Sequence, residues 1–203
     1  GFDYTRSSNP TRQDLEEHLA ALEGGKYGIA FSSGMASADS CMKLLRQGDH
    51  VVCCDDVYGG TARLFNNLMT NYGVEFTYVD SQVAENVQKA IRPETKMVWV
   101  ETPTNPLLKV TDLEAVGKIA RSNDLLYVVD TTFATPVFLR PLEYGADLVL
   151  HSTTKYLSGH NQIIGGAIIT NREDLFDQLK YIQKSVGAVP SPFDCWLVIM
   201  GLK

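Results

Sequence analysis

Two residues in the second half of the chain have the types and positions that covalent amine chemistry requires. Lys155 follows the apolar run Leu148–Leu150 and the hydroxyl residues Ser152–Thr154, so it stands just beyond the end of an expected buried strand. Asp130 ends a second apolar run, Leu125–Val129. A lysine amine forms a Schiff base with an aldehyde, and a carboxylate keeps a pyridine nitrogen protonated. Together they provide the two fixed points that a pyridoxal phosphate site needs.

Each of these residues also has an ordinary structural explanation. A lysine after a strand is usually a solvated surface residue, and an aspartate after a strand is usually a turn residue or a helix cap. The catalytic interpretation therefore depends on whether other segments supply the rest of such a site.

Five segments of the chain carry a pattern that joins this pair to a known family. They are Tyr4–Thr11, Ser32–Ala36, Asp55–Gly60, Glu101–Pro106 and Ser152–Lys155. Their residues occur in the order and spacing of the Cys/Met-metabolism family of pyridoxal phosphate enzymes. The chain thus resembles this family over essentially all of its 203 residues. The resemblance rests on the whole set, because each short motif alone is unspecific.

The length and composition are those of an ordinary globular domain. A chain of 203 residues with 44% hydrophobic and 21% charged residues can bury one substantial core. Members of the resembled family are considerably longer. We therefore expect residues 1–203 to be the pyridoxal-phosphate-binding large domain of a longer chain, without its N-terminal arm and its C-terminal domain.

Charge and cysteine usage argue against several other functions. The net charge of -6, without a basic cluster, argues against nucleic-acid binding, and the chain has no polybasic patch or apolar run of membrane-spanning length. The cysteines have no CxxC spacing and the histidines no paired ligand spacing, so we expect reduced thiols, no metal site and a cytoplasmic protein. The cysteines are Cys41, Cys53, Cys54 and Cys195.

Strand-like and helix-like patterns alternate along the chain, as in repeated βαβ units. The expected strands are Gly28–Phe31, His50–Cys54, Glu75–Val79, Met97–Glu101, Leu125–Asp130, Leu148–His151 and Gly166–Thr170. The expected helices are Thr11–Glu23, Met35–Arg46, Gly60–Tyr72, Val83–Ile91, Asp112–Ser122, Arg172–Val186 and one within Ser191–Lys203. This order predicts an α/β fold, with three α/β/α layers around a mostly parallel, about seven-stranded sheet. The resemblance implies the same fold, that of the large domain of fold type I enzymes.

Ligands of open parallel sheets gather at the carboxyl ends of the strands. In this chain every candidate residue follows the end of an expected strand, so all should meet at one edge. They are Ser33 and Gly34, Tyr58, Glu101 to Asn105, Asp130 and Lys155.

The expected phosphate site combines a helix N-terminus with nearby hydroxyls. Gly34 and Met35 open a helix, whose free N–H groups attract phosphate. Ser152 and Thr154 share a strand face and, by resemblance, add hydroxyl donors to the same phosphate. The plainer alternatives are a strand-to-helix turn and ordinary polar residues at a strand end.

The resemblance assigns further roles around the cofactor ring. Asp130 faces the pyridine nitrogen, Tyr58 stacks on the ring, and Asn105 lies near it. Arg63 and Glu101 are expected at the substrate edge.

By resemblance, Tyr4 and Arg6 reach the phosphate of a neighbouring subunit, where an arginine fork binds two oxygens at once. The site would then be shared between two chains of a dimer, within an expected tetramer. Two positions depart from the family pattern: Ser8 replaces a common glycine, and Asn161-Gln162 replaces a common Ser-Asp pair after His160.

The resemblance implies cleavage of a small sulfur amino acid, cystathionine, to a thiol, a 2-oxo acid and ammonia. Lys155 binds the cofactor and then shuttles protons at Cα and Cβ, with Tyr58 and Asp130 as the other catalytic residues. Cystathionine γ-synthase and O-acylhomoserine sulfhydrylase remain alternatives, as does a non-catalytic cofactor-binding or scaffold domain. The residues leave β- and γ-elimination open. Methionine γ-lyases carry a cysteine at Gly60 and are disfavoured.

Overall fold

A single sheet of seven strands, in the order β1-β7-β6-β5-β4-β2-β3, forms the centre of the computed structural model, which describes residues 1–203. Only β7 runs in the direction opposite to the other six strands, so the expected mostly parallel sheet is confirmed. β1 and β3 are the edges of this sheet. The strands are β1 (Tyr27–Phe31), β2 (His50–Cys54), β3 (Glu75–Val79), β4 (Thr95–Glu101), β5 (Leu126–Asp130), β6 (Leu148–His151) and β7 (Gly166–Thr170).

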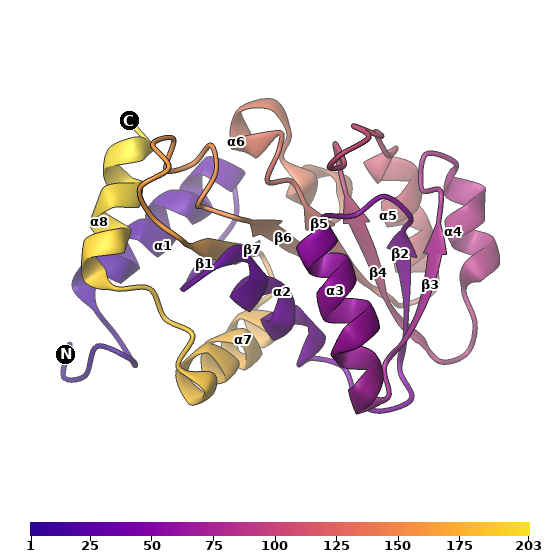
Figure 1. Cartoon of the computed structure of the whole chain (residues 1–203), viewed down its shortest axis with the longest axis horizontal. Coiled ribbons are helices and arrows are strands. Elements are labelled where there is room, and N and C mark those ends of the chain that lie inside the picture. Colours follow the sequence, from indigo (N-terminus) through magenta and orange to yellow (C-terminus); the bar gives the residue numbers. More distant parts are fainter.

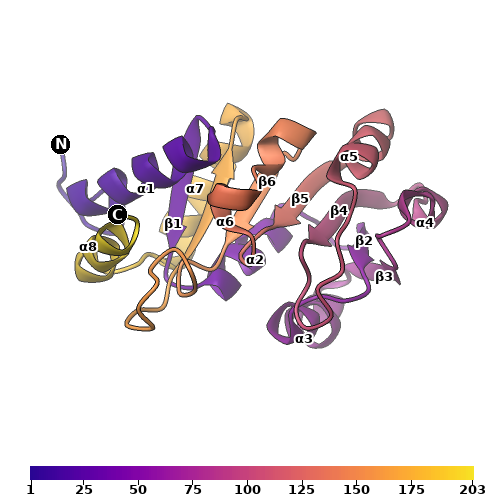
Figure 2. The ribbon, with the colours of Figure 1, turned by 90° about the horizontal axis from the view of Figure 1, so that it is seen from above.

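Helices cover both faces of the sheet, and Figure 2 shows the layers from above. One face is covered by α1 (Pro10–Glu23), α4 (Ala84–Ala90), α5 (Leu113–Ser122) and α8 (Pro192–Gly201). The other face is covered by α2 (Gly34–Met42), α3 (Gly59–Asn67), the 3-10 helix η1 (Met69–Tyr72) and α7 (Glu173–Val186). The expected three-layer α/β/α architecture is therefore confirmed.

Coverage on both faces explains the composition of the strands. All five residues of β2 are buried, as are all five of β7, because neither face of a central strand meets water. Neighbouring residues of a strand enter opposite cores: Val98 packs with one helical layer and Trp99 with the other. Near-continuous apolar runs are thus required here.

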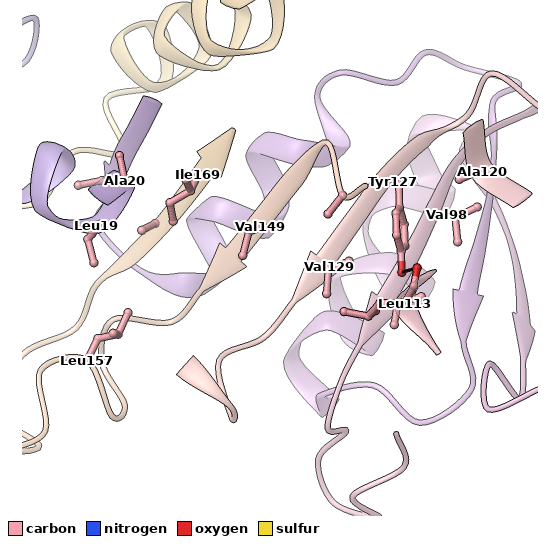
Figure 3. Packing of buried hydrophobic residues seen from close by; sticks show 14 of the residues in the cluster. Leu19, Ala20, Val98, Leu113, Ala120, Tyr127, Val129, Val149, Leu157 and Ile169 are labelled. Carbon is pink, nitrogen blue, oxygen red and sulfur yellow. Dashed lines mark hydrogen bonds between the residues drawn. The ribbon is translucent and has the colours of Figure 1, made fainter. Parts of the chain in front are cut away.

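The core between the sheet and α1, α4, α5 and α8 is drawn in Figure 3. Buried side chains from six strands, all but β3, and from the covering helices meet there, among them Leu19, Leu113, Val129 and Ile169. Tyr127 is fully buried in this core, and its hydroxyl donates to the carbonyl of Leu113 at 3.5 Å. The sheet and α5 are thereby joined by a polar contact as well as by packing.

Local signals fix the ends of α1. The Asn9 side chain accepts hydrogen bonds from the amides of Thr11 (3.0 Å) and Arg12 (3.2 Å), and Pro10 occupies the first turn. The helix stops at Gly24, as the sequence predicts, and α8 lies alongside it (Figure 1). No helix of the structure is both long and apolar enough to cross a membrane.

The structure differs from the sequence-based expectation mainly at helix ends. The expected helix Gly60–Tyr72 is divided at Leu68 into α3 and η1, and the expected helix Met35–Arg46 ends at Met42. The short α6 (Thr135–Phe138) and the 3-10 helix η2 (Pro141–Tyr144) were not expected. Four residues make about one helical turn, so such elements have no hydrophobic periodicity to detect.

Candidate active site

A cavity of about 760 Å³ opens at the carboxyl ends of the strands. Its walls come from the segments that follow β1, β2, β4, β5 and β6, as the strand-end argument predicts. Among the lining residues are the predicted Gly34, Met35, Tyr58, Glu101, Asn105, Asp130, Ser152, Thr154 and Lys155.

Asp130 is the buried anion of this cavity. It is 8% exposed, and its Oδ1 accepts hydrogen bonds from the amide (3.0 Å) and the hydroxyl (2.7 Å) of Thr132. Burial raises the pKa of the Asp130 carboxyl, while the two Thr132 bonds oppose that rise. The Thr132 hydroxyl also accepts from the amide of Ser152 at 2.8 Å. The ends of β5 and β6 are thus tied together.

Lys155 presents the amine of the cavity. Its backbone is held in a turn, with its amide donating to the Ser152 carbonyl (3.2 Å) and its carbonyl accepting from the amide of Gly159 (2.9 Å). The side chain lines the cavity and makes no hydrogen bond or ion pair within the chain. The amine is therefore free to react while its base is fixed.

The N-terminus of α2 lies against Ser152. Ser33 caps the helix, and its hydroxyl accepts from the amide of Ala36 at 2.9 Å. The amides of Gly34 and Met35, at the start of the helix, have no intrahelical acceptor. A Cβ on Gly34 would lie 2.8 Å from Cβ of Ser152, so only glycine permits this approach. Helix amides and a serine hydroxyl therefore share one end of the cavity.

Thr154 differs from its expected role as a free hydroxyl donor. Its hydroxyl donates to the carbonyl of Gly165 (3.1 Å) and accepts from the amide of the same residue (3.0 Å). These bonds join the Lys155 turn to the start of β7. The hydroxyl is engaged within the chain, although the residue lines the cavity.

Tyr58 stands at the start of α3 and is 43% exposed. A Cβ on Gly60 would overlap the Tyr58 ring and approach Sδ of Met35 to 2.9 Å. The ring therefore lies directly over the α3 backbone at Gly60. Glycine at this position sets where the aromatic face stands in the cavity wall.

Glu101 lies deeper than a substrate-edge residue. It is 6% exposed, and its two carboxylate oxygens accept from the amides of Asn105 (Oε1, 2.8 Å) and Tyr58 (Oε2, 2.8 Å). Burial, followed by repulsion from Asp130, raises the pKa of Glu101 to about 8. The carboxylate holds two loops of the site rather than facing a substrate.

Three predicted residues lie away from the cavity of their own chain. Arg6 donates to the carbonyl of Lys184 at 2.7 Å, and its guanidinium stands over the Tyr4 ring at 5.0 Å. Arg63 is exposed on α3, with its side chain near Gly59.

Several lining residues escaped the sequence analysis. Thr132 was detectable, because a hydroxyl two residues after an aspartate at a strand end is placed for a local Asx-type hydrogen bond. Phe133 and Tyr156 form an edge-to-face pair at 6.1 Å and had no such signal. Asn161 lines the cavity with a left-handed backbone (φ 54°), which asparagine tolerates better than most residues.

Comparison with known proteins identifies the family. The model of the Cys/Met metabolism PLP-dependent enzyme family matches residues 1–203. The chain belongs to this family. Members of the Cys/Met metabolism family depend on pyridoxal phosphate, the cofactor that the sequence predicts.

Individual relatives in the family are similar over the whole chain. A probable cystathionine gamma-synthase of Herpetosiphon aurantiacus is 50% identical over 203 residues, which are 100% of this chain and 64% of that protein. The cystathionine gamma-lyase of Bacillus subtilis is 50% identical, with 100% and 54% covered. The crystal structure of metB from Corynebacterium glutamicum superposes with a TM-score of 0.98 at 50% identity, covering 100% of this chain and 53% of that one. The chain therefore spans little more than half the length of these relatives.

The residues of the cavity fit the family cofactor. Pyridoxal phosphate needs an amine for its aldehyde, an anion for its ring nitrogen and donors for its phosphate. The free amine of Lys155, the buried carboxylate of Asp130 and the helix N-terminus beside Ser152 have these properties. The close approach at Gly34 leaves backbone amides open where a side chain would cover them.

We predict that Gly60→Ala moves the Tyr58 ring without unfolding the protein. The new methyl group overlaps a partly exposed ring, which can swing away, so the unfolding free energy should change by less than about 1 kcal/mol. Pyridoxal phosphate affinity should fall about tenfold, since the aromatic wall is displaced. Cofactor titration and thermal unfolding measure the two effects.

Gly59→Ala is the matched control for Gly60→Ala. A Cβ on Gly59 meets only the end of Arg63, at 3.7 Å, so this variant should match the wild type in both measurements. Equal cofactor affinity in the two variants would contradict the assigned role of Gly60.

Proposed function

We propose that this protein is a pyridoxal-phosphate-dependent carbon–sulfur lyase that cleaves cystathionine by β- or γ-elimination. The observation that carries the proposal is the free amine of Lys155 and the buried carboxylate of Asp130 in the same cavity, in a chain of this family. Two of the relatives, a cystathionine gamma-lyase and a probable cystathionine gamma-synthase, support a cystathionine-type substrate.

Five parts of the chain would hold the cofactor. Lys155 binds its aldehyde, and Asp130 keeps its ring nitrogen protonated. Tyr58 offers an aromatic face, and Asn105 borders the ring. The first turn of α2, with Gly34, Met35 and the Ser152 hydroxyl, binds the phosphate; Thr154 supports the Lys155 turn from its bonds to Gly165.

When bound, pyridoxal phosphate supplies an electron-accepting ring that stabilises negative charge at the substrate Cα. The protein supplies the proton transfers. After an amino-acid substrate displaces it, Nζ of Lys155 removes the proton at Cα and moves protons at Cβ. The carboxylate of Asp130 is buried and fixed by Thr132, so it would hold the proton on the ring nitrogen through its negative charge with little screening by water.

A second subunit is proposed to complete the site. Arg6 and Tyr4 form a pair at the surface of their own chain and would bind the phosphate held by a partner chain, within a dimer that pairs into a tetramer. Residues 1–203 would then be the cofactor-binding large domain of the enzyme. The four unpaired, buried cysteines support a cytoplasmic location.

Lys155→Ala is expected to abolish covalent attachment of the cofactor and turnover, because the reacting amine is removed. Borohydride reduction of the wild-type protein with pyridoxal phosphate, followed by peptide mapping, should find the adduct on Lys155. Lys109, engaged with Asp55 and Asp80, is a matched control that should remain unmodified. An adduct on any lysine other than Lys155 would overturn the assignment.

Product analysis with L-cystathionine separates the candidate reactions. We expect a 2-oxo acid to form: pyruvate with homocysteine indicates β-elimination, and 2-oxobutyrate with cysteine indicates γ-elimination. Formation of cystathionine from an O-acylhomoserine and cysteine, without cleavage, would favour the γ-synthase that one relative represents. Absence of all these products from protein carrying the cofactor would sink the enzymatic proposal.

Mixed oligomers test the shared site. Chains with Arg6→Ala and chains with Lys155→Ala are combined, at a cofactor concentration that saturates only the wild-type protein. A hybrid dimer then has one site with both defects and one wild-type site, so each hybrid should have about half of the wild-type activity, and a randomly exchanged equimolar mixture about a quarter. Subunit exchange is confirmed by native mass measurement. Activity no higher than the average of the two parents would show that Arg6 does not act across the interface.

A further inference from the structure

The carboxylate of Glu101 joins two walls of the cavity that are distant in sequence. One oxygen accepts from the amide of Tyr58, which follows β2, and the other from the amide of Asn105, which follows β4. Its own amide donates to Sγ of Cys54 at 3.2 Å. The backbone of Glu101 is thus fixed to β2, and its side chain holds the two loops that follow β2 and β4.

Neighbouring contacts do not replace this bridge. Asp56 holds the same loop through the hydroxyl of Thr104 and the amide of Leu107 (2.9 Å), on either side of Asn105. The amides of Asn105 and Tyr58, however, have Glu101 as their acceptor. Glu101 is therefore the side chain that holds the amides of both Tyr58 and Asn105, while Asp55 and Asp56 join the same two loops through Lys109, Thr104 and Leu107.

The bridge needs two acceptor oxygens, which only the ionised carboxyl provides well. The charged and titratable groups around it are Asp130 on β5, Asp56 and Cys54 from the β2 side, Tyr58 on α3 and Lys155 across the cavity. Burial and Asp130 raise the pKa of Glu101 to about 8, so the carboxyl loses its proton as the pH rises from neutral to mildly alkaline.

We propose that Glu101 is a positioning residue that sets the distance between Tyr58 and Asn105, and that release of its proton closes this bridge across the cavity. This inference rests on the proposed function for the place of the cofactor between the two residues. Protonation of the cofactor nitrogen beside Asp130 offsets the charge that repels Glu101. Cofactor binding and bridge closure therefore favour each other.

The bridge has a cost in the absence of the cofactor. The pKa of Glu101 in the fold, about 8, lies above its ordinary value of 4.5. The stability that the protonated Glu101 carboxyl contributes to the fold is therefore fully present below pH 4.5 and is lost as the pH rises through 8. Without the positive charge of the protonated cofactor nitrogen, the fold thus disfavours the ionised Glu101 carboxylate that holds the two loops.

Amide hydrogen exchange of the full chain measures the bridge directly. We expect protection of the Tyr58 and Asn105 amides, corrected for intrinsic exchange, to rise about tenfold between pH 6.5 and 9.5 in cofactor-free protein. In Glu101→Gln this dependence should vanish, because a carboxamide keeps one acceptor and turns a donor toward the second amide. Glu101→Asp keeps the charge but is shorter, so it should protect one amide at most.

The same exchange measurement on a control variant tests whether the pH dependence belongs to Glu101. Glu85→Gln, an exposed change on α4, should leave the profile unchanged. Protection that does not depend on pH in the wild type, or is equal in wild type and Glu101→Gln, would overturn the proposal; the wild-type profile needs no variant to fold.

Adding pyridoxal phosphate separates this proposal from the proposed function. The cofactor should move the midpoint of the exchange profile to lower pH in the wild type, and Glu101→Gln should show no such profile. A midpoint that stays fixed on cofactor binding would overturn the coupling. A borohydride adduct away from Lys155, with an intact exchange profile, would instead defeat the proposed function and leave the bridge standing.

Discussion

The site depends on a short chain of hydrogen bonds that crosses from β5 to β6. Asp130 accepts from the amide and the hydroxyl of Thr132, and that hydroxyl accepts from the amide of Ser152. Because Ser152 begins the turn that carries Lys155, the anion and the amine are fixed to each other through three residues. At the base of this turn, His151 contacts Glu23 of α1 in the opposite helical layer. The turn that carries Lys155 is therefore held both by the end of β5, through Thr132, and by α1, through Glu23.

The strands were predictable because the sheet is buried on both faces. His50–Cys54, Glu75–Val79, Leu148–His151 and Gly166–Thr170 have the same bounds in sequence and structure, since turn residues bracket each run. The ends of α2 and α3 were less predictable. Where a helix must stop is decided by the path into the next strand, as at Leu68, and a periodic pattern holds no information about that path.

The residues of the site divide in a similar way. Lys155, Asp130 and Gly34 follow strand ends, so the topology alone brings them together. The hydrogen bonds of Glu101 and Thr154 were not predicted, because their partners lie far along the chain or across a turn: Glu101 meets Tyr58 forty-three residues away, and Thr154 meets Gly165 eleven residues away. Hydrogen bonds between distant segments leave no periodic mark in a sequence.

The edge strand β3 affects whether two copies of this chain can join their sheets. An unpaired strand edge offers a row of backbone donors and acceptors to any other extended chain, which is the first step of aggregation. Here β3 has only five residues and begins with the exposed Glu75, which is paired to Arg92. A short, charged edge is a poor template for a foreign strand. Two copies of this protein are thus discouraged from extending each other's sheet at β3.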